Sequence, residues 1–275
     1  MRETVRNAGL ALAIATALAG CGKPEPQAAP AAGDTDALAQ KEVSDPVAVP
    51  DIVAKAVADP RRDLHRARDA YRHPAEVVAF AGLKPGDRVL DLIPSSGYWS
   101  RIFSPLVGPE GHVYAVWPKA YADVAQSDVK VMRELAARDD YANLSVEVQP
   151  TPDLTAPEPL DLVFTSQNYH DYPDEFMGHY DPGKLNRAVF AMLKPGGTYL
   201  IVDHAAEAGS GMRDTDTLHR IDQAIVRRQV EAAGFEFVGE SRILRNSADD
   251  HTLPVFDPKV RRNTDQFVLR FRKPA

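Results

Sequence analysis

The sequence has only one cysteine, Cys21, among 275 residues, so no disulfide can form within a single chain. It also lacks a long hydrophobic run, because the apolar stretch from Ala8 to Ala19 falls short of the roughly 20 residues that a membrane-spanning helix needs. A surplus of positive charge is missing as well, since the formal net charge is −7. We therefore expect no nucleic-acid partner, because phosphate backbones attract basic surfaces.

Several catalytic motifs are absent too. The sequence contains no serine nucleophile elbow, no glycine-rich phosphate-binding loop and no zinc-binding helix. These absences argue against the enzyme classes that depend on those motifs. What is present is a stretch from about residue 51 to residue 275 that is long enough for one α/β domain with its own core.

The amino-terminal segment has the pattern of a secretion signal. Arg2 and Arg6 precede the short apolar run, which ends in Leu-Ala-Gly-Cys at Cys21. This ending resembles the bacterial lipoprotein processing box, in which the chain is cut before the cysteine and the thiol is joined to diacylglycerol. The resemblance implies a signal peptide over residues 1–20 and a lipid anchor on Cys21. It also implies a periplasm-facing location in the bacterial cell envelope, with the outer membrane favoured because Gly22, not Asp, follows the cysteine.

Residues 21–50 are expected to form a lipidated tether. They are rich in Ala, Pro and Asp and show no apolar period, so they cannot bury enough surface to offset chain entropy. The domain is then expected over residues 51–275. Within it we expect strands at 88–93, 111–117, 144–148, 160–166, 198–203, 235–244 and 266–271, and helices at 63–72, 74–83, 128–138, 184–193 and 218–233.

The segment 89–101 reads as a buried strand that carries Asp91 and runs through a tight turn with Gly97 into a helix. It resembles the first motif of class I S-adenosylmethionine (AdoMet) methyltransferases. Further landmarks follow in the family's order at 160–164, 193–203 and 231–235, and details of the turn and of 168–171 resemble a bacterial group of predicted methyltransferases that often carry signal peptides. The resemblance implies an α/β fold with a doubly wound, mostly parallel seven-stranded sheet whose last strand is antiparallel.

The turn departs from the family pattern of three alternating glycines. Ile93 and Ser95 occupy the first two glycine places, and Pro94 removes a backbone N–H. Trp117 stands where the family has an acid for the ribose hydroxyls, and an indole only donates hydrogen bonds. Trp117 is therefore either an adenine-stacking residue or a surface-capping aromatic, and the turn is either a cofactor site or purely structural. The cofactor-binding residues that the resemblance implies are Asp91, Ser95, Ser96, Gly97, Tyr98, Trp117 and Asn168.

Two histidines follow strands whose carboxyl ends should meet at one edge of the sheet. His170 is the expected catalytic base, because an imidazole titrates near neutrality, and Asp171 either orients it or faces water. His204 follows the next strand and is expected on the same rim as a third catalytic residue. No close ligand spacing among these residues favours a metal, so no metal site is expected.

Three further polar residues, His219, Arg220 and Asp222, are expected on the helix over 218–233. They either contact an anionic substrate or form a solvated helix face. Together these features predict an AdoMet-dependent methyltransferase that acts on a small molecule or a cell-envelope component. The alternative is a non-catalytic periplasmic lipoprotein that keeps the fold and uses its altered cleft to bind a different ligand.

The lipoprotein box makes a direct prediction about location. Cys21→Ser removes the thiol that would carry the lipid, so the protein should move from the membrane pellet to the soluble fraction on cell fractionation. Sedimentation with membranes that does not change in the variant would refute the anchor.

Overall fold

The computed structural model describes residues 47–151 and 153–275. The expected signal peptide, Cys21 and nearly all of the expected tether lie outside the described residues. Within the described part, no helix combines the length and the apolar character that crossing a bilayer would require.

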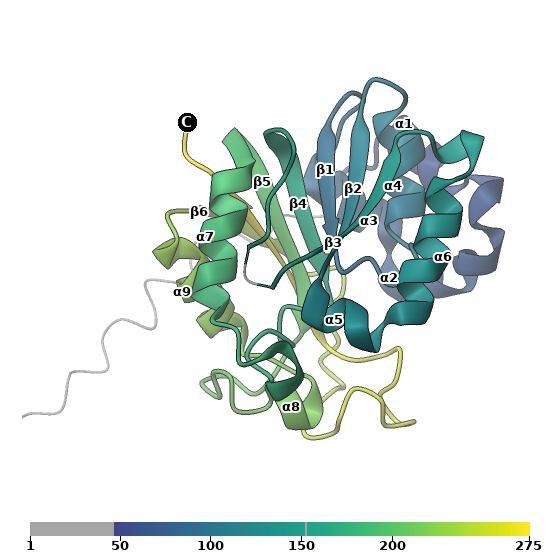
Figure 1. The fold of residues 1–275 in the computed structure, drawn as a ribbon. Helices are drawn as coiled ribbons and strands as arrows, with labels where there is room; N and C mark the ends of the chain where they lie inside the picture. Colours follow the sequence, from purple (N-terminus) through teal and green to yellow (C-terminus); the bar gives the residue numbers. More distant parts are fainter. Residues whose placement is uncertain (1–46, 152) are drawn as a thin grey trace, which may run out of the picture. The chain divides into compact units, whose positions relative to one another are not determined.

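The described residues form one seven-stranded sheet with the order β3-β2-β1-β4-β5-β7-β6 (Figure 1). Strands β1 to β5 pair in parallel, whereas β7 runs antiparallel to both β5 and β6. This topology confirms the predicted fold. The strands are β1 (Arg88–Leu92), β2 (His112–Pro118), β3 (Leu144–Gln149), β4 (Leu160–Ser166), β5 (Leu193–His204), β6 (Glu236–Ser241) and β7 (Gln266–Arg272).

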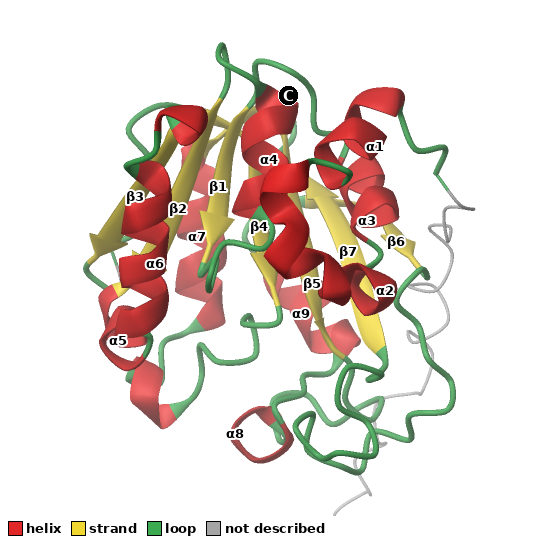
Figure 2. Cartoon of the chain, turned by 90° about the vertical axis from the view of Figure 1, so that its right-hand side faces the viewer, coloured by secondary structure: helices red, strands yellow, loops and turns green. Residues whose placement is uncertain are grey.

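Helices cover both faces of the sheet. Figure 2 looks onto the face covered by α1, α3, α4 and α6, and α7 and α9 lie behind the sheet. The α-helices are α1 (Asp51–Val57), α2 (Asp69–Arg72), α3 (Pro74–Ala81), α4 (Ser100–Val107), α5 (Lys119–Val124), α6 (Gln126–Ala136), α7 (Pro182–Met192), α8 (Thr215–Leu218) and α9 (Gln223–Ala232), with 3₁₀ turns η1 (Pro60–Arg68), η2 (Asp139–Tyr141) and η3 (Glu175–Met177).

Because both faces are covered, the central strands β1 and β4 are buried along nearly their whole length. An aromatic cluster of Trp99, Phe103 and Phe164 packs beneath the end of β1, with ring centroids 4.9–6.3 Å apart. This packing anchors the start of α4 and therefore the turn that precedes it.

The carboxyl ends of β1, β2, β4 and β5 meet at one edge of the sheet. In Figure 1, α5, α8 and the long segment before β7 gather at this edge, in the lower part of the view. The edge therefore brings together loops from several distant parts of the sequence.

The prediction of one helix over residues 218–233 is wrong in its first part. The chain forms the short α8, leaves the helix at His219 with a left-handed backbone (φ 53°), and starts α9 at Gln223. Tertiary contacts override the helical pattern, because the N–H of Ile221 donates to the carbonyl of His204 and the side chain of Asp222 caps α9.

Strand β5 begins earlier than predicted. It starts at Leu193 instead of residue 198, and its pairing with β4 is irregular between the pairs Leu160–Leu193 and Leu162–Thr198. Gly196 supplies the left-handed backbone (φ 79°) that this irregularity needs.

Gly97 is required by packing as well as by backbone angle. Its φ is 84°, and a Cβ atom there would lie 2.3 Å from Sδ of Met132 on α6. Gly86 has nearly the same φ, 86°, but a Cβ atom there would meet no atom within 4 Å. Comparing alanine substitutions at Gly97 and Gly86 therefore separates the cost of backbone strain from the cost of a steric clash.

We expect Gly97→Ala to destabilise the protein by about 2–4 kcal/mol, because it adds overpacking to strain. Gly86→Ala should cost only about 1 kcal/mol, because it adds strain alone. Chemical denaturation of the two variants tests this difference, and equal losses would show that Met132 moves aside without cost.

Candidate functional site

The turn after β1 keeps a backbone shape that suits glycine. Ile93 and Ser95 have φ values of 56° and 53°, and Gly97 follows at 84°. These are the three positions at which the family pattern has glycine. A left-handed conformation costs a residue with a side chain about 1–2 kcal/mol, so the turn preserves the shape at an energetic cost.

Asp91 lies in the wall of the cavity beneath this turn. Asp91 is 1% exposed, and its carboxylate accepts a hydrogen bond of 2.6 Å from Oγ of Ser100. Burial raises the pKa of Asp91 to about 7, although Ser100 and the nearby Arg72 act in the opposite direction. A buried carboxyl group whose pKa is shifted this far is typical of a functional site.

Asn168 fixes the turn to the end of β4. Its side-chain amide donates to the carbonyls of Leu92, Ile93 and Ser166, and its oxygen accepts from the hydroxyl of Thr165. Asn168 lies beside the cavity beneath the turn, but these bonds engage its side chain with the protein itself.

A cavity of about 150 Å³, the turn cavity, lies beside Asp91. Arg72 reaches it from α2, places its guanidinium 4.8 Å from the ring centre of Tyr98, and donates to Oε1 of Gln167 at 2.8 Å. The lining residues are Arg68, Arg72, Asp91, Ile93, Pro94, Ser95, Tyr98, Trp99, Tyr121, Asp128, Ser166, Gln167 and Asn168.

A second cavity of about 460 Å³, the rim cavity, adjoins the first and shares Tyr121, Asp128 and Gln167 with it. Three of its lining side chains, Val124, Phe176 and Phe256, are large, hydrophobic and exposed. The remaining lining residues are Ala125, Ser127, His170, Asp171, His204, His219 and Val255. The rim cavity thus has an apolar mouth and a floor of histidines and acid.

His170 lies between two carboxylates. Its Nδ1 is 2.7 Å from Oδ1 of Asp203, its backbone N–H donates to Oδ2 of Asp203, and its Nε2 is 3.2 Å from Oδ1 of Asp171. Although burial opposes the charge, Asp203 and Asp171 raise the pKa of His170 to about 10. Both ring nitrogens of His170 thus face a carboxylate. This geometry does not favour the general-base role that the sequence suggested, and Asp171 is buried against the histidine instead of facing water.

His204 and His219 approach the same cluster. The ring of His204 is 6.1 Å from that of His170, but its Nδ1 lies 2.8 Å from Oγ1 of Thr264. Burial and the neighbouring cationic groups lower the pKa of His204 well below its ordinary value. His219 is closer to His170, with ring centres 5.6 Å apart, and its Nδ1 is 3.9 Å from Oδ1 of Asp171.

Other predicted site residues have different surroundings. Trp117 is completely buried in the core and lines neither cavity, so it is not placed to stack on an adenine. Ser95 is exposed and donates to Oδ2 of Asp128 at 3.0 Å, and Ser96 is half-buried in the turn. Tyr98 is buried, and its hydroxyl donates to Asp69 at 2.6 Å.

Arg220 is not a substrate-binding side chain. It is fully buried and donates to the carbonyls of Ala205 and Leu253 and to the carboxylate of Asp249. This network fixes the loop before β7 onto the carboxyl edge. Asp222 likewise caps α9 instead of facing a ligand.

Sequence reasoning missed Arg72, Tyr121, Asp128 and Gln167. They come from helices and a strand end whose packing no local pattern reveals. Gln167 carries one usable signal in the structure, a left-handed backbone (φ 62°) at a residue other than glycine, which often marks a functional turn.

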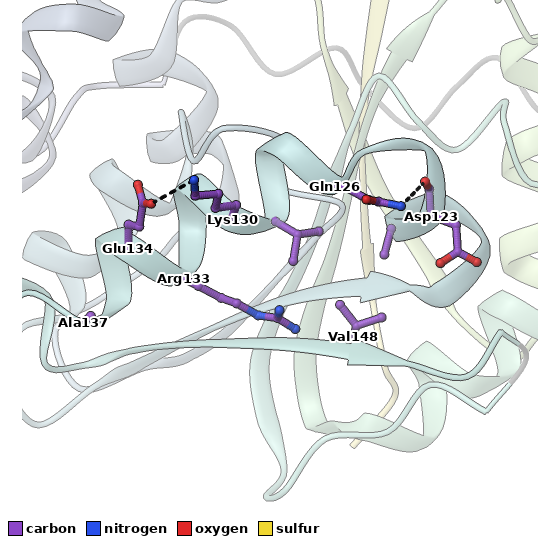
Figure 3. Close-up of a pocket in the computed structure, with 9 residues that line it drawn as sticks. Asp123, Gln126, Lys130, Arg133, Glu134, Ala137 and Val148 are labelled. Atoms are coloured by element: carbon purple, nitrogen blue, oxygen red, sulfur yellow. Dashed lines mark hydrogen bonds and ion pairs between the residues drawn. The ribbon is translucent and has the colours of Figure 1, made fainter.

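A larger groove of about 640 Å³ lies between α5, α6 and β3 (Figure 3). Lys130 pairs with Glu134 along α6 at 3.9 Å, and Gln126 donates to the carbonyl of Asp123. The groove shares no lining residue with the turn cavity or the rim cavity. Size alone therefore does not identify the site.

Comparison with known proteins identifies the family. A family model described as a methyltransferase domain matches residues 83–234, more than half of the chain. The chain belongs to the methyltransferase domain family. The match runs from the residues before β1 through α9 and includes the turn and Asp91. It also includes the histidine cluster, which consists of His170, His204 and His219.

Relatives of this methyltransferase-family protein include the ubiquinone/menaquinone biosynthesis C-methyltransferases UbiE. The protein of Pasteurella multocida is 31% identical over 129 residues, which cover 45% of this chain and 42% of the relative. That of Proteus mirabilis is 27% identical over 202 residues, covering 69% and 70%. In several of these relatives, the matched part spans only 42–63% of their length.

Solved structures share the fold. A SAM-dependent methyltransferase from Aquifex aeolicus aligns with a TM-score of 0.51 at 20% identity, covering 80% of this chain and 97% of that one. The [4+2]-cyclase SpnF aligns with a TM-score of 0.55 at 17% identity, covering 76% and 80%. At these identities the likeness concerns the fold alone.

The raised pKa of Asp91 predicts a pH-dependent stability difference. Between about pH 4 and 7 the unfolded chain ionises this acid while the folded chain keeps it protonated, so stability falls as the pH rises through this range. Asp91→Asn removes the ionisable group and with it the free-energy cost of burying a charged carboxylate. We expect the variant to be more stable than the wild type by on the order of 4 kcal/mol at pH 8 and nearly equal at pH 4.

Denaturant unfolding of both proteins at the two pH values measures the difference. A stability difference that is the same at pH 4 and pH 8 would contradict a protonated Asp91 in the folded protein.

Proposed function

We propose that the protein is an AdoMet-dependent methyltransferase that acts on a small apolar molecule or a cell-envelope component. The observation that carries this proposal is the buried Asp91 beside a turn that keeps three left-handed residues in the family's glycine positions. A carboxylate that costs stability in the free protein suits a ligand with a positive charge, because such a ligand favours the ionised form.

The residues around the turn cavity fit the cofactor. Asp91 would hold the amino-acid end of AdoMet, whose ammonium group carries the matching charge. Asp128 lines both cavities and would accept the ribose hydroxyls, which Trp117 cannot do. The turn cavity alone is smaller than the roughly 300 Å³ at which ligand pockets usually begin, so the cofactor would extend into the rim cavity.

The cofactor would supply an electrophilic methyl group. The protein's task is then to hold an acceptor in line with that group and to keep water away, so positioning supplies most of the rate. The exposed Val124, Phe176 and Phe256 at the mouth of the rim cavity favour an acceptor with an apolar body. The UbiE relatives, whose name refers to ubiquinone and menaquinone, also support an acceptor with an apolar body.

The predicted lipid anchor on Cys21 adds support for an acceptor in the cell envelope, and we propose the periplasm-facing location on that ground. The alternative function is a non-catalytic ligand-binding lipoprotein. The observation that favours it is the side chain of Ile93 together with Pro94 in the wall of the small turn cavity, where the family has an open backbone.

Calorimetric titration of the purified full chain with AdoMet and with S-adenosylhomocysteine tests the proposal. We expect micromolar binding of both compounds to the wild type. Asp91→Asn and Asp128→Asn should each weaken binding at least about tenfold, since each removes a charged hydrogen-bond partner.

Asp123→Asn is the matched control. Asp123 lies on the neighbouring α5, is exposed and pairs only with Lys119 in the described contacts, so its loss should leave binding unchanged. If AdoMet and S-adenosylhomocysteine both fail to bind the wild type, the alternative of a different ligand replaces the methyltransferase proposal.

A further inference from the structure

We propose that His170, Asp171 and His219 form a binding site for a divalent transition-metal ion that opens into the rim cavity. Within the described residues, these three side chains form a group whose ligand atoms all lie within 4.8 Å of one another. The sequence did not suggest this set, because it placed His219 on a helix and offered His204 as the second histidine.

The distances approach those of a coordination shell. Ligand atoms about 2.1 Å from a tetrahedral ion are about 3.4 Å apart. Nε2 of His170 is 3.2 Å from Oδ1 of Asp171, and Nδ1 of His219 is 3.9 Å from the same oxygen. Only His219 must therefore move appreciably, and it lies on the non-helical link between α8 and α9 with its side chain about one third exposed.

Asp203 holds His170 in the orientation that metal binding needs. It accepts from Nδ1 of the ring and also from the backbone N–H of His170, at 2.7 and 2.9 Å. This leaves Nε2 directed at Asp171. Histidines that bind metals usually donate their other ring N–H to a carboxylate, which fixes both the tautomer and the ring plane.

The electrostatics of the cluster also suit a cation. The carboxylates of Asp171 and Asp203 lie 3.2 and 2.7 Å from the two ring nitrogens of His170. A divalent ion at Nε2 would lie beside Asp171, while Asp203 keeps its bond to Nδ1.

Two imidazoles and one carboxylate are ligands that suit zinc, iron, cobalt and similar ions. Three protein ligands leave at least one coordination position for another molecule, in contrast to closed structural sites. Since all three side chains line the rim cavity, that position faces the space proposed for the acceptor. An oxygen of the acceptor would bind there, and this last role rests on the proposed function.

The test is a metal titration of the full chain, purified without a polyhistidine tag and stripped with a chelator. Calorimetry with Zn²⁺ and visible absorption with Co²⁺ should both report one bound ion per chain. His219→Asn should weaken binding at least about tenfold, and Asp203→Asn by about 10–100-fold, as is typical of the groups that orient metal ligands. Asparagine suits the left-handed backbone at position 219, so the fold should persist.

His179→Asn is the matched control, because His179 is also left-handed (φ 50°) and exposed but lies outside the cluster. It should bind the ion as the wild type does. Adding acetohydroxamate, an oxygen chelator, should then shift the Co²⁺ spectrum of the wild type, which reports the open position.

The proposal is overturned if neither ion binds in a one-to-one ratio, or if His219→Asn binds the ion as tightly as His179→Asn does. If acetohydroxamate leaves the Co²⁺ spectrum unchanged, the proposal of an open coordination position is wrong. AdoMet binding by the chelator-treated chain is measured separately, so failure of the metal site and failure of the methyltransferase proposal are distinguishable.

Discussion

The site depends on one side chain that joins two strands. Asn168, at the end of β4, donates to the carbonyls of Leu92 and Ile93 at the end of β1. These bonds hold the turn in its left-handed shape, even though Ile93 and Ser95 do not favour it. The same few residues after β4 carry His170 and Asp171. One connection therefore positions the turn cavity on one side and the histidine cluster on the other.

Two buried acids show how surroundings give one residue type different properties. For Asp91, burial outweighs the hydrogen bonds from Ser100 and the charge of the nearby Arg72, so its pKa rises. Asp203 bonds two groups of His170 and the backbone N–H of His204, so its charge has close partners. We infer that the first is suited to a cationic ligand and the second to holding a histidine in place.

Much of the fold was predictable from the sequence, because strands buried on both faces read as continuous apolar runs. The strand over 160–166 has its predicted bounds, and the antiparallel last strand is confirmed. The site was less predictable. Asp91 lies on β1 and His170 follows β4, so both could be proposed from the strand pattern. Tyr121 and Asp128 come from helices whose approach depends on packing. The prediction of a helix over 218–233 was wrong in its first part because residues there pair with the end of β5.

The sequence by itself determined the order of strands and helices, the family, and the edge of the sheet at which chemistry is expected. The order of the elements and the edge follow from local periodicity and from the rule that parallel strands end together. The family follows from the resemblance of the motifs at 89–101, 160–164, 193–203 and 231–235. Only the tertiary structure decided that Trp117 is buried, that Arg220 binds backbone carbonyls, and that His219 lies beside His170 and Asp171. The physical reason is that burial, hydrogen bonding and charge arise between residues far apart in the chain, and no local pattern records them.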